Sequence, residues 1–300
     1  MKGKINKREV KNWLSGFVCA LPVILGVLIF TFYPAVQSLI YSFHDYDGLQ
    51  AMQFVGIDNF VMMFKYDPDT WQVFGNTFLY AFISVPLNLL LGYLLALAAN
   101  SKVKGVGVYR VLYYLPVIIP AVANGILFGD LFSAGTDGIF NRFLTMLGLP
   151  RQPFFTSSDT AMATMIIMGF WGLGGSMIIW LAAFKNIDVS LYEGASLDGA
   201  NAFQRLLHIT IPMSSPVIFY NLVMGIIGSL QTTSTLFVGG KDGTGIGNSL
   251  YFIAIKIYRS FMGGQYGYAS AFAWVLFAVI AVLTAIIFKT SKWVYYGEDS

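Results

Sequence analysis

The chain has 300 residues, of which 56% are apolar and only 11% carry a formal charge. Soluble domains are far less apolar, so this composition predicts a protein whose main solvent is the lipid bilayer. A single cysteine, Cys19, excludes an internal disulfide, and two histidines are too few for a His-rich metal site, so we expect no bound metal. The net charge of +3 comes without a basic patch interleaved with aromatic residues, which argues against nucleic acid as a partner.

Six apolar runs are long enough to cross a hydrocarbon core of roughly 30 Å as helices. In chain order the runs are Trp13 to Phe32, Phe78 to Ala99, Val108 to Phe132, Ala161 to Phe184, Pro216 to Val238 and Tyr268 to Phe288. The first run follows a basic start and is too long for the core of a signal peptide, so we expect a retained span. The sequence therefore predicts an all-α, polytopic membrane protein with six transmembrane helices.

The basic residues predict the direction of these spans. Twelve Lys and Arg fall on the side that holds the N-terminus and six on the other side, so the positive-inside rule places both termini in the cytoplasm. Residues 1–12 are then a basic cytoplasmic start, 13–290 one transmembrane domain with a cytoplasmic segment at 185–215, and 291–300 a cytoplasmic tail. The outer loops, of about thirty residues each, are too short for a domain, so a large outer receptor must be another chain.

The cytoplasmic segment has the pattern of two short helices joined by a turn. Helical spacing surrounds Glu193, and Asp198-Gly199 is a turn signal because glycine tolerates a positive φ. A second helix can begin after Asn201, a good N-cap residue, and Pro212 would end it because proline lacks an amide hydrogen. The pattern is compatible with an amphipathic connector at the lipid headgroups and with a docking surface for a soluble partner.

A resemblance favours the docking surface. The residues that carry it are, in order, Glu193, Ala195, Gly199, Ile209, Ile211 and Pro212. Their order and spacing resemble the EAA loop of binding-protein-dependent ABC importer permeases, where the loop is a coupling helix docked into a cleft of the cytoplasmic ATPase. Gly194 departs from the family pattern, which usually has alanine there, and Ile211 replaces the usual leucine.

The resemblance implies the site and the partners. The implied ATPase-coupling residues are Leu191, Tyr192, Glu193, Ala195, Leu197, Asp198, Gly199, Ala200, Ile209 and Pro212. It also implies a second permease subunit as a heterodimer, two copies of an ATPase that bind ATP and Mg, and an extracytoplasmic solute-binding protein. This chain itself would bind no cofactor, and it would lie in the cell membrane of a bacterium or archaeon.

Further stretches resemble the carbohydrate branch of the family, which includes maltose, multiple-sugar and glycerol-phosphate permeases. They are Tyr33 to Leu39, Tyr41 to Gly48, Phe54 to Phe60, Asn76-Thr77, Tyr113 to Pro116 and Gly267 to Ala271. Gly239 to Gly243 departs from that branch, which commonly has Gly-Gly-Pro there. The resemblance covers nearly the whole chain and implies that the solute is a sugar or oligosaccharide.

Polar and aromatic residues within the spans are candidates for the solute pathway. They are Trp171, Asn221, Ser229, Gln231, Asn88 and Asn124. Amides suit sugar hydroxyls and an indole ring suits the C–H face of a sugar, but such residues also hold transmembrane helices to one another. In the resembling family, often only one of the two permeases holds the sugar.

Missing motifs exclude other mechanisms. Gly240-Lys241-Asp242 lacks the Ser or Thr of a phosphate-binding P-loop, so we expect ATP hydrolysis in a partner chain and no enzymatic activity here. An ion-coupled secondary transporter would need buried carboxylates that the predicted spans lack. That transporter class and an ABC permease for a non-sugar solute, such as glycerol phosphate, stay as alternatives.

Overall fold

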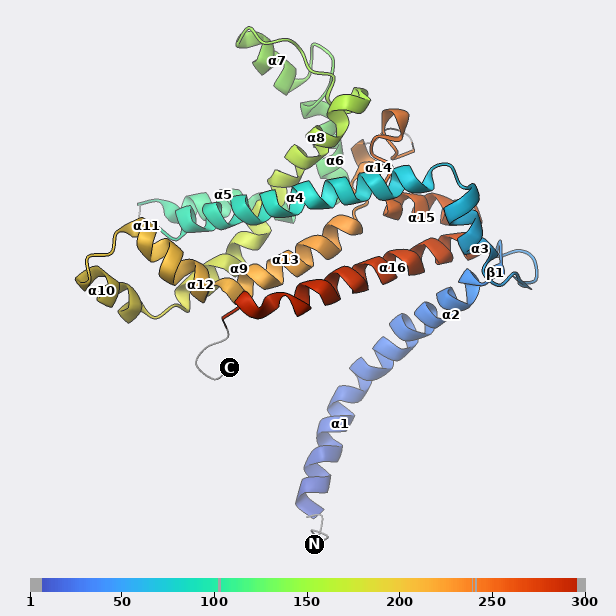
Figure 1. Cartoon of the computed structure of the whole chain (residues 1–300), viewed down its shortest axis with the longest axis horizontal. Helices are drawn as coiled ribbons and strands as arrows, with labels where there is room; N and C mark the ends of the chain where they lie inside the picture. The colour runs from blue at the N-terminus through green and yellow to red at the C-terminus, as the bar shows by residue number, and fades with distance from the viewer. Residues whose placement is uncertain (1–6, 102–103, 239, 241, 296–300) are drawn as a thin grey trace. The chain divides into compact units, whose positions relative to one another are not determined.

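The structure is a computed structural model, in which most of the described residues are helical (Figure 1). It describes residues 7–101, 104–238, 240 and 242–295. The remaining parts of the basic start and the C-terminal tail, and positions 239 and 241 of the Gly-Gly-Lys segment, lie outside the described residues. The chain divides into two compact units, residues 1–67 with 259–274 and residues 68–258 with 275–300.

The first unit begins with a continuous apolar helix. It consists of α1 (Lys7–Val27), a π-helical turn (Leu28–Phe32) and α2 (Tyr33–Ser42). A short antiparallel ladder follows, in which His44 of β1 (His44–Asp45) lies opposite Phe54 of β2 (Gln53–Phe54). The small helix α3 (Asp58–Val61) and a π-helical turn (Met62–Tyr66) come next, and the first part of α16 belongs to the same unit.

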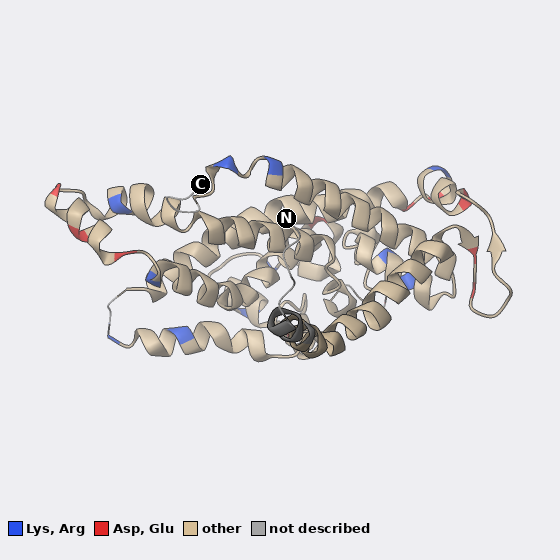
Figure 2. Ribbon diagram, turned by 90° about the horizontal axis from the view of Figure 1, so that it is seen from below, with Lys and Arg blue, Asp and Glu red and all other residues tan. Residues whose placement is uncertain are grey.

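The second unit contains most of the helices. They are α4 (Thr70–Ala99), α5 (Val106–Ile118), α6 (Ala121–Leu131), α7 (Ile139–Met146), α8 (Ser158–Gly169), α9 (Gly174–Lys185), α10 (Val189–Leu197), α11 (Ala202–Arg205), α12 (Ile211–Met213), α13 (Ser215–Leu230), α14 (Thr235–Val238), most of α15 (Ile253–Met262) and the rest of α16 (Tyr266–Lys289). Figure 2 shows the Lys, Arg, Asp and Glu residues mainly at helix ends and in connecting segments. The interiors of α4, α9, α13 and α16 carry no formal charge, as residues facing lipid require.

The core of this unit lies where α4 packs against α9 and α13. The Tyr93 ring meets the Trp180 and Phe184 rings edge to face, with centroids 5.0 and 5.2 Å apart, an arrangement that the ring quadrupoles favour. Gly92 permits the close approach, because a Cβ at this position would lie 2.9 Å from Ser176 Oγ. Aromatic contacts and small residues therefore hold the central helices together, as is common between transmembrane helices.

Within the described residues, four helical stretches are long and apolar enough to span a membrane, and each of two bent pairs adds one more if the pair is a single span. The predicted first span is too short at its C-terminal end, because the helix continues through Pro34 to Ser42. A π-helical turn precedes this proline, and the Tyr33 N–H reaches back to Leu28 O. Proline is thus placed in the first turn of α2, where its missing N–H costs little.

The predicted third and fifth spans are interrupted. Val108 to Phe132 contains α5 and α6, bent by 103° at Ile119-Pro120, where Ile119 is extended (ψ 127°) because proline disfavours the helical conformation in the preceding residue. Pro216 to Val238 contains only α13 and the separate α14. The polar run 231–234 separates them, since Ser and Thr side chains compete for backbone hydrogen bonds.

Candidate functional site

The segment between α9 and α12 begins with a well-capped helix. Asp188 is the N-cap of α10, and its carboxylate accepts a hydrogen bond from Ser190 N at 2.9 Å. Gly199 ends the helix in the left-handed conformation, with φ +82°. Ala200 N donates to Ala195 O at 2.9 Å, and Gly199 N donates to Ser196 O at 3.2 Å. These two bonds form a Schellman motif, which requires a residue that tolerates a positive φ.

A second helical stretch follows at once. Asn201 and Gln204 form a reciprocal capping box at the start of α11. A π-helical turn (Leu206–Thr210) then leads into α12, so the expectation that Pro212 ends this stretch is wrong. The turn places Pro212 within the first turn of α12, where no amide hydrogen is needed. The helical path bends by 65° only after Met213, at Ser214.

Side chains tie α10 to this second stretch. Tyr192 Oη and Thr210 Oγ1 are 2.9 Å apart and share a hydrogen bond. Arg205 Nη1 donates to Ser196 Oγ at 2.9 Å. The two bonds bridge 18 and 9 residues of sequence, so the two helices and their turn form one body.

This body is attached to the helical core at one end and exposes apolar side chains at the other. Leu206 and Ile211 pack against the core around Tyr93 and Trp180, and Tyr93 Oη lies 3.0 Å from Ser214 Oγ. At the opposite end Leu197 is 91% exposed and Phe203 is 66% exposed. Exposed apolar residues on a body joined to the core are suited to receiving a partner and transmitting its movement.

The predicted coupling residues occupy this body in two groups. Exposed positions are Leu191, Glu193, Leu197, Asp198, Gly199 and Pro212, and half-buried positions are Tyr192, Ala195, Ala200 and Ile209. Sequence reasoning missed Ser196, Arg205 and Thr210, which make the side-chain ties. Their partners depend on the turn geometry, which no local pattern specifies.

A cavity of about 370 Å³ lies among α4, the α8–α9 stretch and α13. Three of the predicted pathway residues, Asn88, Asn221 and Ser229, line it. Trp180, which the sequence analysis did not select, also lines the cavity. The Asn88 Oδ1 and Trp180 Nε1 atoms are buried and have no hydrogen-bond partner. They are an unpaired acceptor and an unpaired donor in two residues that line the cavity.

A second cavity, of about 310 Å³, lies beside the bend between α5 and α6. Trp171 and Asn124 line it, whereas Gln231 is exposed at the end of α13 and lines neither cavity. Trp171 belongs to a 3-10 turn (Phe170–Leu173) between α8 and α9. None of the described residues that line the two cavities carries a formal charge.

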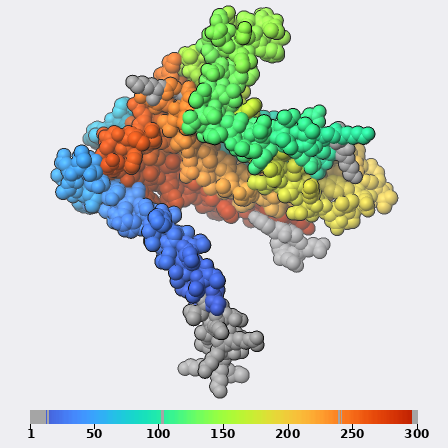
Figure 3. Space-filling view, turned by 180° about the vertical axis from the view of Figure 1, so that it is seen from behind, coloured from blue at the N-terminus to red at the C-terminus, as the bar shows by residue number. Residues whose placement is uncertain are grey.

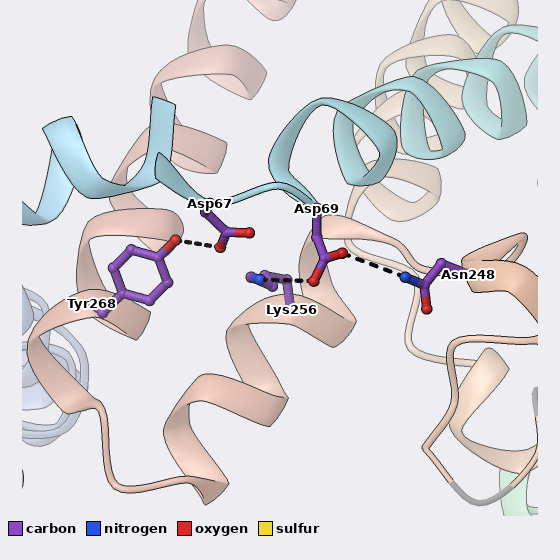
Figure 4. Close-up of polar contacts among 5 residues, drawn as sticks. All are labelled: Asp67, Asp69, Asn248, Lys256 and Tyr268. Carbon is purple, nitrogen blue, oxygen red and sulfur yellow. Dashed lines mark hydrogen bonds and ion pairs between the residues drawn. The ribbon is translucent and has the colours of Figure 1, made fainter. Parts of the chain in front are cut away.

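Polar contacts also fix the N-terminal end of α4. Asp69 Oδ2 forms an ion pair with Lys256 Nζ at 3.4 Å, and Asn248 Nδ2 lies 3.4 Å from Asp69 Oδ1 (Figure 4). Asn76 Nδ2 donates to Asn248 O at 2.7 Å, so α4 holds the loop that precedes α15. Within the first unit, Tyr268 Oη donates to the Asp67 carboxylate. These pairings join distant parts of the chain, so no local sequence pattern predicts them.

Two exposed carboxylates outside the spans have lowered pKa values. The pKa of Asp47 lies below its ordinary value because its carboxylate accepts hydrogen bonds from the Gln50 and Leu49 amides. The pKa of Asp188 is lowered mainly by the Ser190 amide at the start of α10. Amide donors stabilise the charged form of each group.

The apolar helices, the uncharged polar cavities and the helical body attached to the core define a multi-pass membrane protein of the transport class. Residues 88–294 match the family described as the binding-protein-dependent transport system inner membrane component. This chain belongs to that family.

Similar proteins span nearly the whole length of the chain. The "Probable ABC transporter permease protein YesP" of Bacillus subtilis is 39% identical over 95% of this chain and 93% of its own. The lactose transport system permease protein LacF of Rhizobium radiobacter is 31% identical over 93% and 94%. A solved bacterial alginate ABC transporter, in complex with an alginate pentasaccharide-bound periplasmic protein, contains a chain with a TM-score of 0.83 and 26% identity, covering 95% of this chain and 96% of that one.

Proposed function

We propose that this chain is the permease subunit of an ATP-driven ABC importer that moves a sugar or oligosaccharide into the cytoplasm. The observation that carries the proposal is the helical body of residues 189–213, which exposes Leu197 and Phe203 and packs against the core through Leu206 and Ile211. The family and the lactose and alginate transport systems of similar proteins support the transport class and the saccharide solute.

The contacts suggest how movement of an ATPase would reach the solute. A force on α10 would pass through the Tyr192–Thr210 and Arg205–Ser196 hydrogen bonds to the stretch that ends at Ser214. Ser214 contacts Tyr93, and Tyr93 packs against Trp180, which lines the larger cavity. Nucleotide can change the cavity only if docking differs between nucleotide states.

The larger cavity has the chemistry of a saccharide site. Asn88 Oδ1 can accept a hydrogen bond from a sugar hydroxyl, and Trp180 Nε1 can donate one. The Asn221 amide and the Ser229 hydroxyl add further polar groups. Glycerol phosphate, the alternative solute, would call for a cation beside its phosphate, so the uncharged lining described above favours a sugar.

The remaining assignments complete the proposal. The bent pair of α5 and α6 counts as the third span and the stretch of α13 and α14 as the fifth, which gives six spans in one transmembrane permease domain of residues 13–290 with both termini cytoplasmic. The partners are a second permease, two ATPase copies that bind ATP and Mg, and an outer solute-binding protein. The chain lies in the cell membrane and hydrolyses no ATP itself.

The decisive experiment reconstitutes the complete transporter in vesicles and measures ATP hydrolysis with the binding protein and a panel of saccharides. At least one saccharide should stimulate hydrolysis, and Asn88→Leu should weaken that response without loss of ATPase from the purified complex. If an ATPase co-purifies and no saccharide stimulates it, the solute assignment is wrong. If no ATPase co-purifies with the wild-type chain, the importer assignment is wrong.

A further inference from the structure

A groove of about 320 Å³ on the surface of the second unit lies between α5 and α9 and shares no lining residue with the polar cavities. Its walls are almost entirely apolar, and residues that line it include Val111, Leu115, Ile118, Ile178 and Leu181. Ile118 is 67% exposed and Ile178 is 48% exposed. Figure 3 shows α5 on the surface of this unit, so the groove is open to whatever surrounds the protein.

Helix packing explains why the groove forms. Gly174 brings the start of α9 against the α5 backbone, because a Cβ there would overlap the Tyr113 carbonyl. Further along α9 the larger side chains of Ile178 and Leu181 line the groove. The pair is therefore closed near Gly174 and open toward the beginning of α5.

The Arg110 side chain stands at the open end. Arg110 lines the groove, and its Nε and Nη2 atoms donate to Ala99 O at 3.0 and 2.7 Å. A guanidinium has five N–H groups, so three stay available after these two bonds. Lys104 precedes α5 and Lys185 ends α9, so both add positive charge at the same end. Asp188, the next acidic residue after Lys185, already accepts a hydrogen bond from Ser190 N.

The dimensions fit one leaflet of a bilayer. From Arg110 to Ile118 a helix rises about 12 Å, at roughly 1.5 Å per residue. Half of a hydrocarbon core of about 30 Å is about 15 Å. The α5 helix ends at Ile118 and the chain bends at Pro120. The apolar part thus extends from the headgroup level to about the middle of the membrane.

We propose that this groove binds an anionic phospholipid, with its phosphate on the Arg110 guanidinium and an acyl chain along the apolar walls. A phosphate complements the free guanidinium N–H groups, and an acyl chain complements the side chains below it. The site requires a chain embedded in lipid, but it is independent of which solute is carried. Bound lipid would fix the spacing between α5 and α9. The α9 helix also carries Trp180, which lines the larger cavity.

The first test measures lipid retention by the intact transporter. The complex is delipidated and incubated with equal amounts of phosphatidylglycerol and phosphatidylcholine of the same acyl chains. The lipids that stay bound are then identified and quantified by native mass spectrometry. Phosphatidylglycerol should be retained about tenfold more than phosphatidylcholine, the preference expected from one charge-assisted contact. Arg110→Gln should reduce this ratio to about one, whereas Lys289→Gln, the same charge change at the end of α16, should leave it unchanged.

A second test keeps Arg110 and the fold intact. A photo-crosslinking amino acid at Ile178 should give an adduct with the mass of phosphatidylglycerol in vesicles that contain it. Leu115→Trp, which fills the groove, should abolish that adduct. An adduct with a protein chain would show that a partner subunit covers the groove and would overturn the proposal. Equal retention of the two lipids by the wild type, or an unchanged ratio in Arg110→Gln, would overturn it as well.

Discussion

Two glycines in the proposed coupling body should respond in opposite directions to the same substitution. Gly199 adopts φ +82° at the end of α10, and Gly194 lies inside that helix with no atom within 4 Å of an added Cβ. Alanine at 199 must either adopt the left-handed conformation, at a cost of roughly 1–2 kcal/mol, or break the Schellman turn. Alanine at 194 should instead stabilise the helix by about 0.5–1 kcal/mol.

These energies translate into measurable differences in docking. A penalty of 1–2 kcal/mol lowers the population of the body seen here by a factor of roughly 5–30, relative to forms without the turn. The affinity of the ATPase for Gly199→Ala should fall by up to the same factor, and uptake should fall with it. Gly194→Ala should bind the ATPase at least as tightly as the wild type.

The assay is a titration of the ATPase onto the permease pair in nanodiscs, followed by uptake in vesicles at saturating ATPase. Helical content and the yield of permease pair serve as controls for folding. Equal affinities for the two variants would refute the reasoning, because the turn geometry would then be irrelevant to docking. A lower affinity of the ATPase for Gly194→Ala alone would refute the reasoning more directly.

Three further variants test the route from α10 to the cavity and the cap of α10. Tyr192→Phe removes one hydrogen bond to Thr210, with a net cost of about 0.5–1.5 kcal/mol, so solute-stimulated ATP hydrolysis should fall. In a double-mutant cycle, adding Thr210→Val to Tyr192→Phe should cause little further loss of that hydrolysis. Trp180→Phe removes the unpaired indole N–H of a residue that lines the larger cavity, so the saccharide concentration for half-maximal stimulation should rise. Because the pKa of Asp188 is lowered in the folded state, the stabilisation that its carboxylate gives α10 is complete above the ordinary pKa of 3.8 and is lost as the pH falls through the lower folded value. The helix content of α10 should therefore be constant around neutral pH and fall in acid. Asp188→Asn should remove that acid dependence.

The sequence predicted the helical bilayer protein and the two-helix body well, because both depend on local signals. Apolar runs specify long helices, and Asn201 and Gly199 specify where short helices begin and end. Breaks at prolines were harder to predict, because Pro86 and Pro116 lie inside helices whereas Pro120 marks the 103° bend. The single sequence carries no signal that separates the proline at the bend from the two inside helices.

In the candidate sites, too, residues marked by local sequence signals could be predicted and residues that depend on packing could not. Asn88, Asn221 and Ser229 could be selected as polar residues within apolar runs, and they line one cavity. Trp180 was not selected, because in sequence it is one more apolar residue of α9, and only packing against Tyr93 reveals its unpaired N–H. The ion pair of Asp69 with Lys256 spans 187 residues and follows from no local pattern.

The π-helical turns before Pro34 and Pro212 make these stretches sensitive to chain length. Each turn holds one more residue than an α-helical turn, with the Tyr33 and Ile211 amides bonded five residues back. Deleting one residue from such a turn would restore α-helical pairing and rotate everything beyond it by about 100°, the angle per residue of an α-helix. In the turn at 206–210, such a deletion would move Ile211 away from the core while leaving the sequence of the exposed helix intact. The orientation of the segment at 189–205 toward its surroundings thus depends on the number of residues in the turn at 206–210.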